Sequence, residues 1–376
     1  MKFSDIIGNA GLKENLASMV REGRTGHAFL FQEEPGYGAI AFALALAQYL
    51  CCPHRTDADS CGECTSCNQM QKLIHPDLHF AFPVNTSTSV PASAKQPVSD
   101  MFLPLWRRLV LDNPYFSEQD LYDAIGIDDK AGGISVNEAN NIMNVLSLKP
   151  FEAEYKIMII YLPERMNAVA SNKLLKLLEE PPAGTEFMLI TQSVEKLLPT
   201  IISRCQIISV PPMLPDELSS ALATKYGFDA GTAGIDARLS GGSYGKSMEL
   251  VREQTEVSSD RQLLYDLLEK GLSHDLDGMF DVSNALCEMG KEKQKNFCAF
   301  GENLARKLLM LNLGMDGIAY ATPAEKDYLE SLSKRIKPDF YRKMLALFDA
   351  TLYELDNNVN VKLIFSNLCN QFYLSL

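Results

Sequence analysis

The sequence predicts an α/β domain with a mostly parallel sheet, followed by an all-helical C-terminal region. Short apolar runs typical of buried strands alternate with helical segments between residues 27 and 210. A strand, a glycine-containing turn and an apolar helix follow one another at 27–50, which is how nucleotide-binding α/β domains begin. Beyond Pro215 the strand signal disappears, and the pattern becomes one of amphipathic helices.

The elements of the predicted α/β domain follow from local residue patterns. Its four strands are short apolar runs, at residues 27–31, 156–161, 187–191 and 206–210. The turn at 33–38 leads into an apolar, alanine-rich helix at 40–50. Ser135 and Glu138 have the spacing of a capping box and predict the start of a helix. Another helix, at 167–178, ends before two prolines, so helices alternate with strands as a parallel sheet requires.

The chain is expected to fold in three parts. Residues 1–211 form the α/β domain, which contains a cysteine-rich module at about 51–75 and an insertion at about 81–133. Residues 212–257 are expected to form a small domain of short helices, broken at Gly227, Gly241-Gly242 and Gly245. Residues 258–376 carry long amphipathic helices, which can bury their own core and pack against similar domains.

Composition and charge narrow the class of protein. Of 376 residues, 46% are hydrophobic and 22% are charged, which is typical of a soluble globular protein. The 35 basic and 48 acidic residues leave a net charge of −13, which argues against a protein that binds duplex DNA without a partner. No apolar stretch predicts a transmembrane helix, and the first residues lack the apolar core of a signal peptide. We therefore expect a cytoplasmic protein without a membrane partner, whose cysteines stay reduced unless a metal holds them.

Five of the nine cysteines lie between residues 51 and 67. Four of them have the spacing C-x8-C-x2-C-x2-C, namely Cys52, Cys61, Cys64 and Cys67. This pattern predicts a structural Zn²⁺ ion, because four protein ligands leave no open position for catalysis. The alternatives are free thiols or a disulfide, and a reducing compartment disfavours the disulfide. Cys51 is expected to be a buried residue at a helix end, and His54 is a further candidate ligand.

The turn after the first strand resembles a phosphate-binding loop that has lost its chemistry. Such a loop reads GxxxxGK[ST], whereas residues 33–40 read Glu-Glu-Pro-Gly-Tyr-Gly-Ala-Ile. Two glycines remain and three key positions are replaced, which gives the set Glu33, Gly36, Gly38, Ala39 and Ile40. Glu33 also brings negative charge to a helix N-terminus that would favour phosphate. Tyr161 ends the second predicted strand, where an ATPase carries magnesium-binding carboxylates. We therefore expect the loop to keep its shape and to bind no ATP.

Several segments together resemble one protein family. In chain order they are residues 3–9 (FSDIIGN), 27–31 (HAFLF), the cysteine module, 75–77 (HPD), 174–182 (LLKLLEEPP) and 199–205 (PTIISRC). The pattern is similar to that of bacterial clamp-loader subunits of the AAA+ class. Because its phosphate loop is degenerate, the chain resembles the delta-prime subunits of DNA polymerase III in particular. The resemblance covers essentially the whole chain, except that the insertion 81–133 departs from the pattern and has no role in it.

The resemblance implies an architecture and a function. It implies an AAA+ domain with a zinc module, a small helical lid domain and a helical collar domain for assembly. Clamp loaders are rings of five subunits that use ATP to place the sliding clamp on primed DNA. This chain would be a non-hydrolysing stator, that is, a rigid subunit of the ring beside the gamma/tau motor and delta subunits. It would count as an enzyme only as a component of the DNA polymerase. Arg204, in Ser203-Arg204-Cys205, would be an arginine finger that acts on the ATP of a neighbouring subunit.

Three alternatives remain open at this stage. Arg204 is also compatible with an ordinary ion pair near the start of a strand. The chain is alternatively an ATP-hydrolysing motor of the gamma/tau type, against which Ala39, Ile40 and Tyr161 argue. A zinc-dependent nucleic-acid-binding module is the third, but Arg55 and Lys72 are the only cations of residues 51–75.

Overall fold

Five parallel strands between residues 28 and 209 form a single sheet. In this computed structural model, which describes all residues except 88–95, 128–130, 227–229, 256–258, 316–322 and 358, the strands are β1 (Ala28–Gln32), β2 (Leu78–Ala81), β3 (Lys156–Tyr161), β4 (Thr185–Thr191) and β5 (Gln206–Ser209). Their order is β2-β3-β4-β1-β5, and all neighbours run parallel. The sequence analysis missed β2, because it has only four residues and directly follows a turn. The parallel sheet predicted from the alternation of strands and helices is confirmed.

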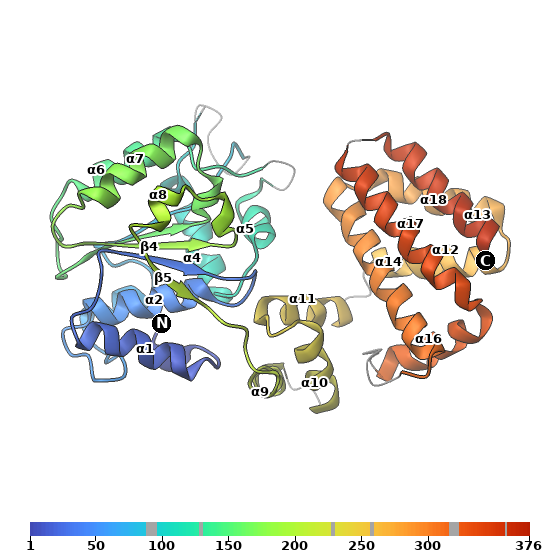
Figure 1. Ribbon diagram of the computed structural model, residues 1–376, viewed down its shortest axis with the longest axis horizontal. Coiled ribbons are helices and arrows are strands. Elements are labelled where there is room, and N and C mark those ends of the chain that lie inside the picture. Colours follow the sequence, from blue (N-terminus) through green and yellow to red (C-terminus); the bar gives the residue numbers. More distant parts are fainter. Residues whose placement is uncertain (88–95, 128–130, 227–229, 256–258, 316–322, 358) are drawn as a thin grey trace. The chain divides into compact units, whose positions relative to one another are not determined.

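Helices cover both faces of the sheet, as Figure 1 shows. On one face lie α1 (Ala10–Arg21) and α2 (Ala39–Cys51), and every residue of α2 is buried. On the other face lie α6 (Val136–Leu146), α7 (Ala168–Glu179) and α8 (Pro199–Ile202). Leu146, Leu174 and Ile201 of these helices share one buried core with strand residues such as Leu30 and Leu189. The burial of α2 explains its alanine-rich sequence, since small side chains allow close packing on the sheet.

The described residues of the insertion contribute a 3-10 helix and two α-helices to this unit. They are η2 (Ser99–Phe102), α4 (Leu103–Asp112) and α5 (Glu118–Ile125). Trp106 of α4 is fully buried, stacks on Phe82 with ring centres 4.3 Å apart, and meets the edge of Phe116 at 5.5 Å. Phe116 in turn contacts the ring of Tyr161 at the end of β3. An aromatic cluster therefore anchors the insertion to the carboxyl end of the sheet.

The expected capping box at the start of α6 has only half of its hydrogen bonds. The Ser135 hydroxyl accepts from the Glu138 N–H at 3.3 Å, so the predicted helix start is confirmed. The buried Glu138 carboxylate, however, accepts from the N–H and the hydroxyl of Ser99, both at 2.6 Å. Glu138 therefore ties α6 to the insertion, which a local sequence pattern does not reveal.

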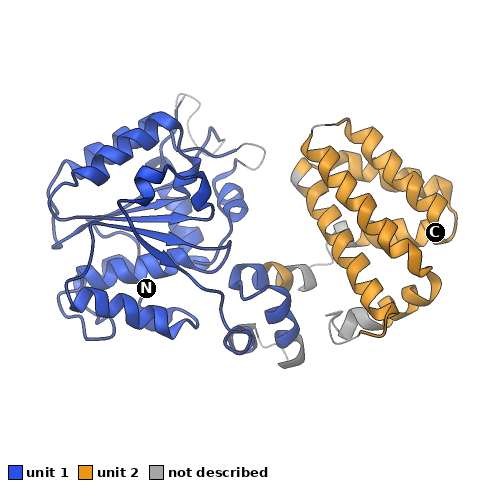
Figure 2. Ribbon diagram, viewed as in Figure 1, with its two compact units in different colours: residues 1–248 blue, residues 249–376 orange. Residues whose placement is uncertain are grey.

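The structure divides into two compact units, residues 1–248 and 249–376 (Figure 2). The helices α9 (Pro215–Tyr226), α10 (Ala230–Leu239) and the first part of α11 (Tyr244–Thr255) belong to the first unit. The expected helix break at Gly245 is wrong, because Gly245 lies in the first turn of α11. The expected break at Gly241 and Gly242 is confirmed, since both have positive φ, and the expected break at Gly227 lies outside the described residues. The remaining elements of the first unit are α3 (Thr65–Gln71), η1 (Phe3–Asp5), η3 (Pro163–Arg165) and η4 (Val194–Lys196).

The second unit is helical throughout its described part. Its helices are α12 (Ser259–Leu272), α13 (Leu276–Glu288), α14 (Lys291–Asn312), α16 (Pro323–Arg335), α17 (Pro338–Asp356) and α18 (Val361–Ser375). Phe348 of α17 lies at the centre of their core, with its ring 6.0 Å from that of Phe297 and 5.6 Å from that of Phe372. A Cβ at Gly301 would lie 2.3 Å from this ring, so glycine is needed where α14 crosses α17. Among the described helices, none combines the length and the apolar character needed to cross a membrane.

Candidate metal centre and degenerate nucleotide site

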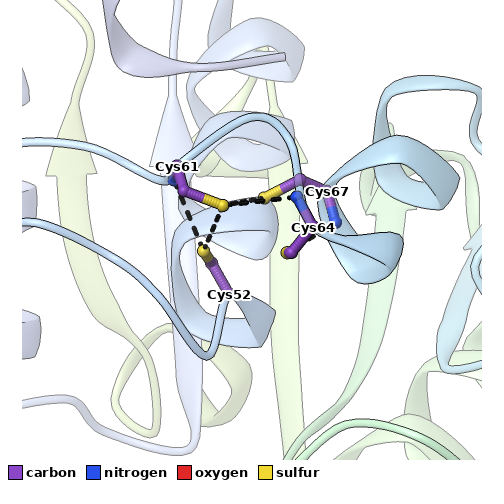
Figure 3. Close-up of side chains that lie close together, drawn as sticks. All are labelled: Cys52, Cys61, Cys64 and Cys67. Atoms are coloured by element: carbon purple, nitrogen blue, oxygen red, sulfur yellow. Dashed lines mark hydrogen bonds between the residues drawn. The ribbon is translucent and has the colours of Figure 1, made fainter.

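The four cysteines predicted to bind a metal come together between α2 and α3. Cys52 directly follows α2, and Cys61 lies in the loop that leads to α3. Cys64 is the N-cap of α3, where its Sγ accepts from the Cys67 N–H in the first turn. Figure 3 shows their four side chains facing one another. Two helix ends and the loop between them therefore bring four sulfur atoms together.

The distances between the sulfur atoms fit a tetrahedral metal site. The four Sγ atoms all lie within 4.8 Å of one another. Cys61 Sγ is 3.5 Å from Cys52 Sγ and 3.8 Å from Cys67 Sγ. Four sulfurs bound at about 2.3 Å around one zinc ion stand about 3.8 Å apart. The predicted group of four is thus close to the geometry that a bound ion needs, and this cluster could hold a metal ion.

The local backbone favours the thiolate form of one ligand. N–H groups of Glu63 and Cys64 point to the Cys61 sulfur and lower the pKa of this thiol to about 6. Burial acts in the opposite direction at Cys52 and Cys67 and raises the pKa of both thiols. Because metals bind thiolates, a cation would have to release the protons of the buried pair. Cys51 is buried apart from the cluster, and its thiol donates to the carbonyl of Tyr155.

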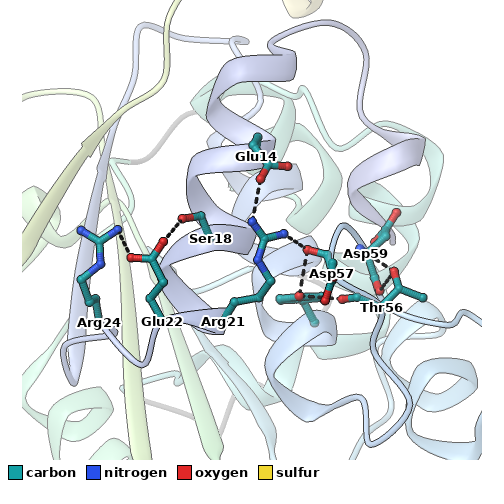
Figure 4. A network of polar contacts seen from close by, with 9 residues as sticks. Glu14, Ser18, Arg21, Glu22, Arg24, Thr56, Asp57 and Asp59 are labelled. Atoms are coloured by element: carbon teal, nitrogen blue, oxygen red, sulfur yellow. Dashed lines mark hydrogen bonds and ion pairs between the residues drawn. The ribbon is translucent and has the colours of Figure 1, made fainter.

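Polar contacts hold the loop between Cys52 and Cys61 against the N-terminal segment (Figure 4). Arg21 of α1 pairs with Glu14 at 2.7 Å and also donates to the Asp57 carbonyl. The Asp59 carboxylate accepts from the N–H groups of Phe3 and Ser4, at 3.0 and 2.9 Å. The loop that carries Cys61 is therefore pre-organised by the protein around it, which lowers the entropic cost of bringing the four thiols together.

The glycine-containing turn after β1 has the shape of a phosphate-binding loop. Gly36 and Gly38 both have positive φ, and Gly38 caps the N-terminus of α2. One oxygen of Glu33, Oε2, accepts from the N–H groups of Gly38 and Ala39, at 2.9 and 2.8 Å. Glu33 is 6% exposed, and burial raises the pKa of its carboxyl to about 7, against the effect of these two hydrogen bonds. A carboxyl group thus takes the backbone donors that face phosphate in a working loop.

The end of β3 offers no carboxylate to a metal-bound nucleotide. Tyr161 is fully buried in the aromatic cluster of the insertion. Glu164, the first carboxylate after the strand, accepts from the Thr191 hydroxyl and the Gln192 N–H, both at 2.9 Å. These bonds direct Glu164 to the end of β4. The replacements noted in the sequence are therefore integrated into the packing and polar contacts of the domain.

Tyr115 packs against the phosphate loop and was not singled out from the sequence. A Cβ at Gly38 would lie 2.4 Å from its ring, and a Cβ at Gly245 would lie 2.3 Å from its carbonyl oxygen. Its hydroxyl accepts from the Ile7 N–H at 3.2 Å. No local pattern singles out this tyrosine, because the contacts that matter are with loops far away in the chain.

Arg204 lies at the surface in an ion pair within its own chain. Its guanidinium pairs with Glu179 at 2.7 Å and also donates to the Thr200 carbonyl at 2.8 Å. The side chains of Arg204 and Glu179 are 34% and 42% exposed. The structure therefore contains the ordinary ion pair considered as an alternative, in a position that solvent can reach.

The sheet, loop and helix arrangement defines a P-loop-type α/β domain whose phosphate loop is closed by its own side chains. The chain belongs to the family described as DNA polymerase III, delta subunit, whose model matches residues 8–214. It is 24% identical to DNA polymerase III subunit delta' of Bacillus subtilis, over 94% of this chain and 92% of that protein. It is 27% identical to the delta' subunit of Escherichia coli, over 63% of this chain and 58% of that protein. These relatives confirm the resemblance to delta-prime subunits.

Other members of the same machinery are also similar. The chain is 26% identical to the tau/gamma subunit of Haemophilus influenzae, over 59% of this chain and 25% of that protein. A solved gamma subunit-related protein of Thermotoga maritima matches 97% of this chain and 99% of its own, with 17% identity and a TM-score of 0.48. By sequence, the chain is thus similar to a tau/gamma subunit as well as to delta' subunits, and the family model places it with the delta subunits.

Proposed function

We propose that the chain is a non-hydrolysing, delta-prime-like subunit of the DNA polymerase III clamp loader. In this role it is a stator in a five-subunit ring, beside the gamma/tau motor and delta subunits, that loads the sliding clamp on primed DNA. The observation that carries the proposal is the Glu33 carboxyl group, which accepts from the Gly38 and Ala39 N–H groups at 2.9 and 2.8 Å. These donors are the ones that a nucleotide phosphate would need. The chain then has no ATPase activity of its own and contributes to the polymerase only as a component.

Arg204 is the residue proposed to act on another subunit. Its ion pair with Glu179 is more than a third exposed on both sides, and such pairs contribute about 0–1 kcal/mol. A phosphate of a neighbouring subunit's ATP can therefore replace the carboxylate at little cost. The planar guanidinium matches phosphate oxygens with two parallel N–H donors. Arginine fingers accelerate hydrolysis by about 10³–10⁵ in other NTPases, which is the effect proposed here.

The cysteine cluster is proposed to bind a structural Zn²⁺. Thiolates are soft ligands that zinc prefers, and the four sulfurs use all the positions of a tetrahedral ion. The ion would join the end of α2, the loop that carries Cys61 and the start of α3. Its role would be to hold this module together, since no ligand position is left for a substrate.

Reconstitution with the motor subunit tests the proposed function. The full chain is purified with gamma/tau and delta subunits, and ATP hydrolysis is measured with clamp and primed DNA, with and without this chain. The proposal predicts co-purification, no hydrolysis by this chain alone, and DNA-stimulated hydrolysis that depends on it. Hydrolysis by the isolated chain would favour the motor alternative. Salt-dependent DNA binding by the isolated chain, without assembly, would favour the nucleic-acid-binding module.

A further inference from the structure

We propose that Glu33 and Tyr115, the latter from the described part of the insertion, form an internal plug against the degenerate phosphate loop and fix the start of α11 to the α/β core of the first unit. This inference deepens the proposed function and rests on it, because it explains how a subunit without ATP keeps one shape. It also gives a role to the insertion, which departs from the pattern of the family. Three sets of contacts within residues 1–248 carry it.

The first contact fills the anion position of the loop. Glu33 Oε2 accepts both N–H groups at the start of α2, those of Gly38 and Ala39. An oxygen in this position uses the two donors whether the carboxyl group is ionised or protonated. The pocket therefore has its oxygen acceptor built into the chain, five residues before the donor Gly38.

The second contact is made by Tyr115 between α4 and α5. Its side chain is 5% exposed and lies against Gly38, where a Cβ would meet the ring at 2.4 Å. Its ring centre is 4.7 Å from that of Tyr244, the first residue of α11. Its hydroxyl accepts from the Ile7 N–H near the N-terminal end. One residue of the insertion thus contacts the N-terminal segment, the phosphate loop and the start of α11.

The third contact joins the phosphate loop directly to the start of α11. The Gly245 N–H donates to the Gly36 carbonyl at 3.1 Å, and the Ser243 hydroxyl donates to the Pro35 carbonyl at 2.8 Å. A Cβ at Gly36 would lie 2.9 Å from the Gly245 Cα, so the two backbones touch. The start of α11 is therefore held directly against the phosphate loop by backbone contacts.

The position of Tyr115 is determined by the aromatic cluster behind it. The next residue, Phe116, packs on Trp106 and on Tyr161, with ring centres 5.5 and 5.3 Å away. Tyr161 stands where an ATPase carries its magnesium-binding carboxylates. A tyrosine at position 161 therefore takes the place of a magnesium-binding carboxylate, and its ring supports Phe116 next to Tyr115. A bound nucleotide can fix a lid on a core only while it is bound, whereas a plug within the chain does so at all times.

Amide hydrogen exchange on the full chain tests the plug without nucleotide. Wild type is compared with Tyr115→Ala and Tyr115→Phe, and with Tyr353→Ala, a change at a tyrosine that is 72% exposed in the second unit. We expect slow exchange at residues 36–41 and 243–247 of the wild type. The Ala variant should exchange at least about tenfold faster in both segments, while the Phe variant, which keeps the ring, and the distant control stay near wild type.

A second variant covers the case in which Tyr115→Ala unfolds the insertion. Ser243→Ala removes the hydroxyl that donates to the Pro35 carbonyl and accepts from the Lys246 N–H, and should speed exchange at residues 36–41 as well as 243–247 while the fluorescence of Trp106 stays unchanged. Fast exchange of both segments in the wild type, or wild-type exchange in both Tyr115→Ala and Ser243→Ala, would overturn the plug. These results would leave the proposed function intact if calorimetry finds no ATP binding. Micromolar ATP binding by the wild type would instead refute the proposed function.

Discussion

Replacing Gly245 by alanine tests whether α11 is packed on the phosphate loop. The added Cβ would lie 2.3 Å from the Tyr115 carbonyl oxygen and 2.9 Å from the Gly36 Cα, which are backbone atoms and cannot rotate away. Overpacking of this kind costs about 1–3 kcal/mol, and loss of the Gly245 N–H bond to Gly36 adds about 1 kcal/mol. Alanine gains about 0.5–1 kcal/mol over glycine in a free helix. We therefore expect the free energy of unfolding to fall by about 1–3 kcal/mol.

Gly11→Ala is the matched control for this change. Gly11 is the second residue of α1, as Gly245 is of α11, and a Cβ there would meet nothing within 4 Å. It should raise the free energy of unfolding by up to about 1 kcal/mol. Urea unfolding followed by the fluorescence of Trp106, the only tryptophan and a buried residue of the first unit, measures both variants. A Gly245→Ala protein as stable as the control would refute the packing argument.

Three further changes test other parts of the account. Cys64→Ser should abolish stoichiometric zinc in elemental analysis and expose the loop before α3 to proteolysis. If the wild-type protein, purified without added metal, contains no zinc, the proposed zinc site is contradicted. Arg204→Ala should lower the rate of ATP hydrolysis by the reconstituted loader at one site without loss of assembly, and Arg204→Lys should not restore the rate. An unchanged rate would mean that Arg204 serves only in its ion pair with Glu179. Asp77→Asn should cost about 2 kcal/mol at pH 7, because the buried carboxylate accepts the N–H groups of residues 151–153 at 2.6–2.9 Å. Although burial opposes ionisation, these bonds lower the pKa of the Asp77 carboxyl. Its contribution to the free energy of unfolding is therefore present above about pH 4 and is lost as the pH falls below that. An equal loss of stability in wild type and Asp77→Asn on acidification would contradict this account.

Much of the site could be predicted because its signals are local. The four cysteines lie within sixteen residues, and their spacing alone predicts that they come together as one possible metal site. The loss of the phosphate loop could likewise be inferred from Ala39 and Ile40. Glu33 was expected to repel phosphate, and the structure adds that its carboxyl group itself takes the loop donors.

The contacts that the sequence did not reveal join distant segments. Tyr115 reaches the loop from 77 residues farther along the chain, so neither periodicity nor a motif identifies it. Glu138 has the spacing of a capping residue, but a buried partner in the insertion, Ser99, takes its carboxylate. The strand β2 is too short for a clear pattern and is determined by its pairing with β3.

Calorimetric titration of the isolated full chain with magnesium and ATP tests the central claim most directly. Wild type and Arg204→Ala are titrated at protein concentrations that detect micromolar affinity, with a gamma/tau motor subunit as the positive control. Because Glu33 takes the loop donors and Arg204 lies outside this pocket, the account predicts no binding heat for either protein. Saturable ATP binding to the wild type with a micromolar dissociation constant would contradict the claim that this subunit keeps its own site closed and acts on the nucleotide of a neighbour.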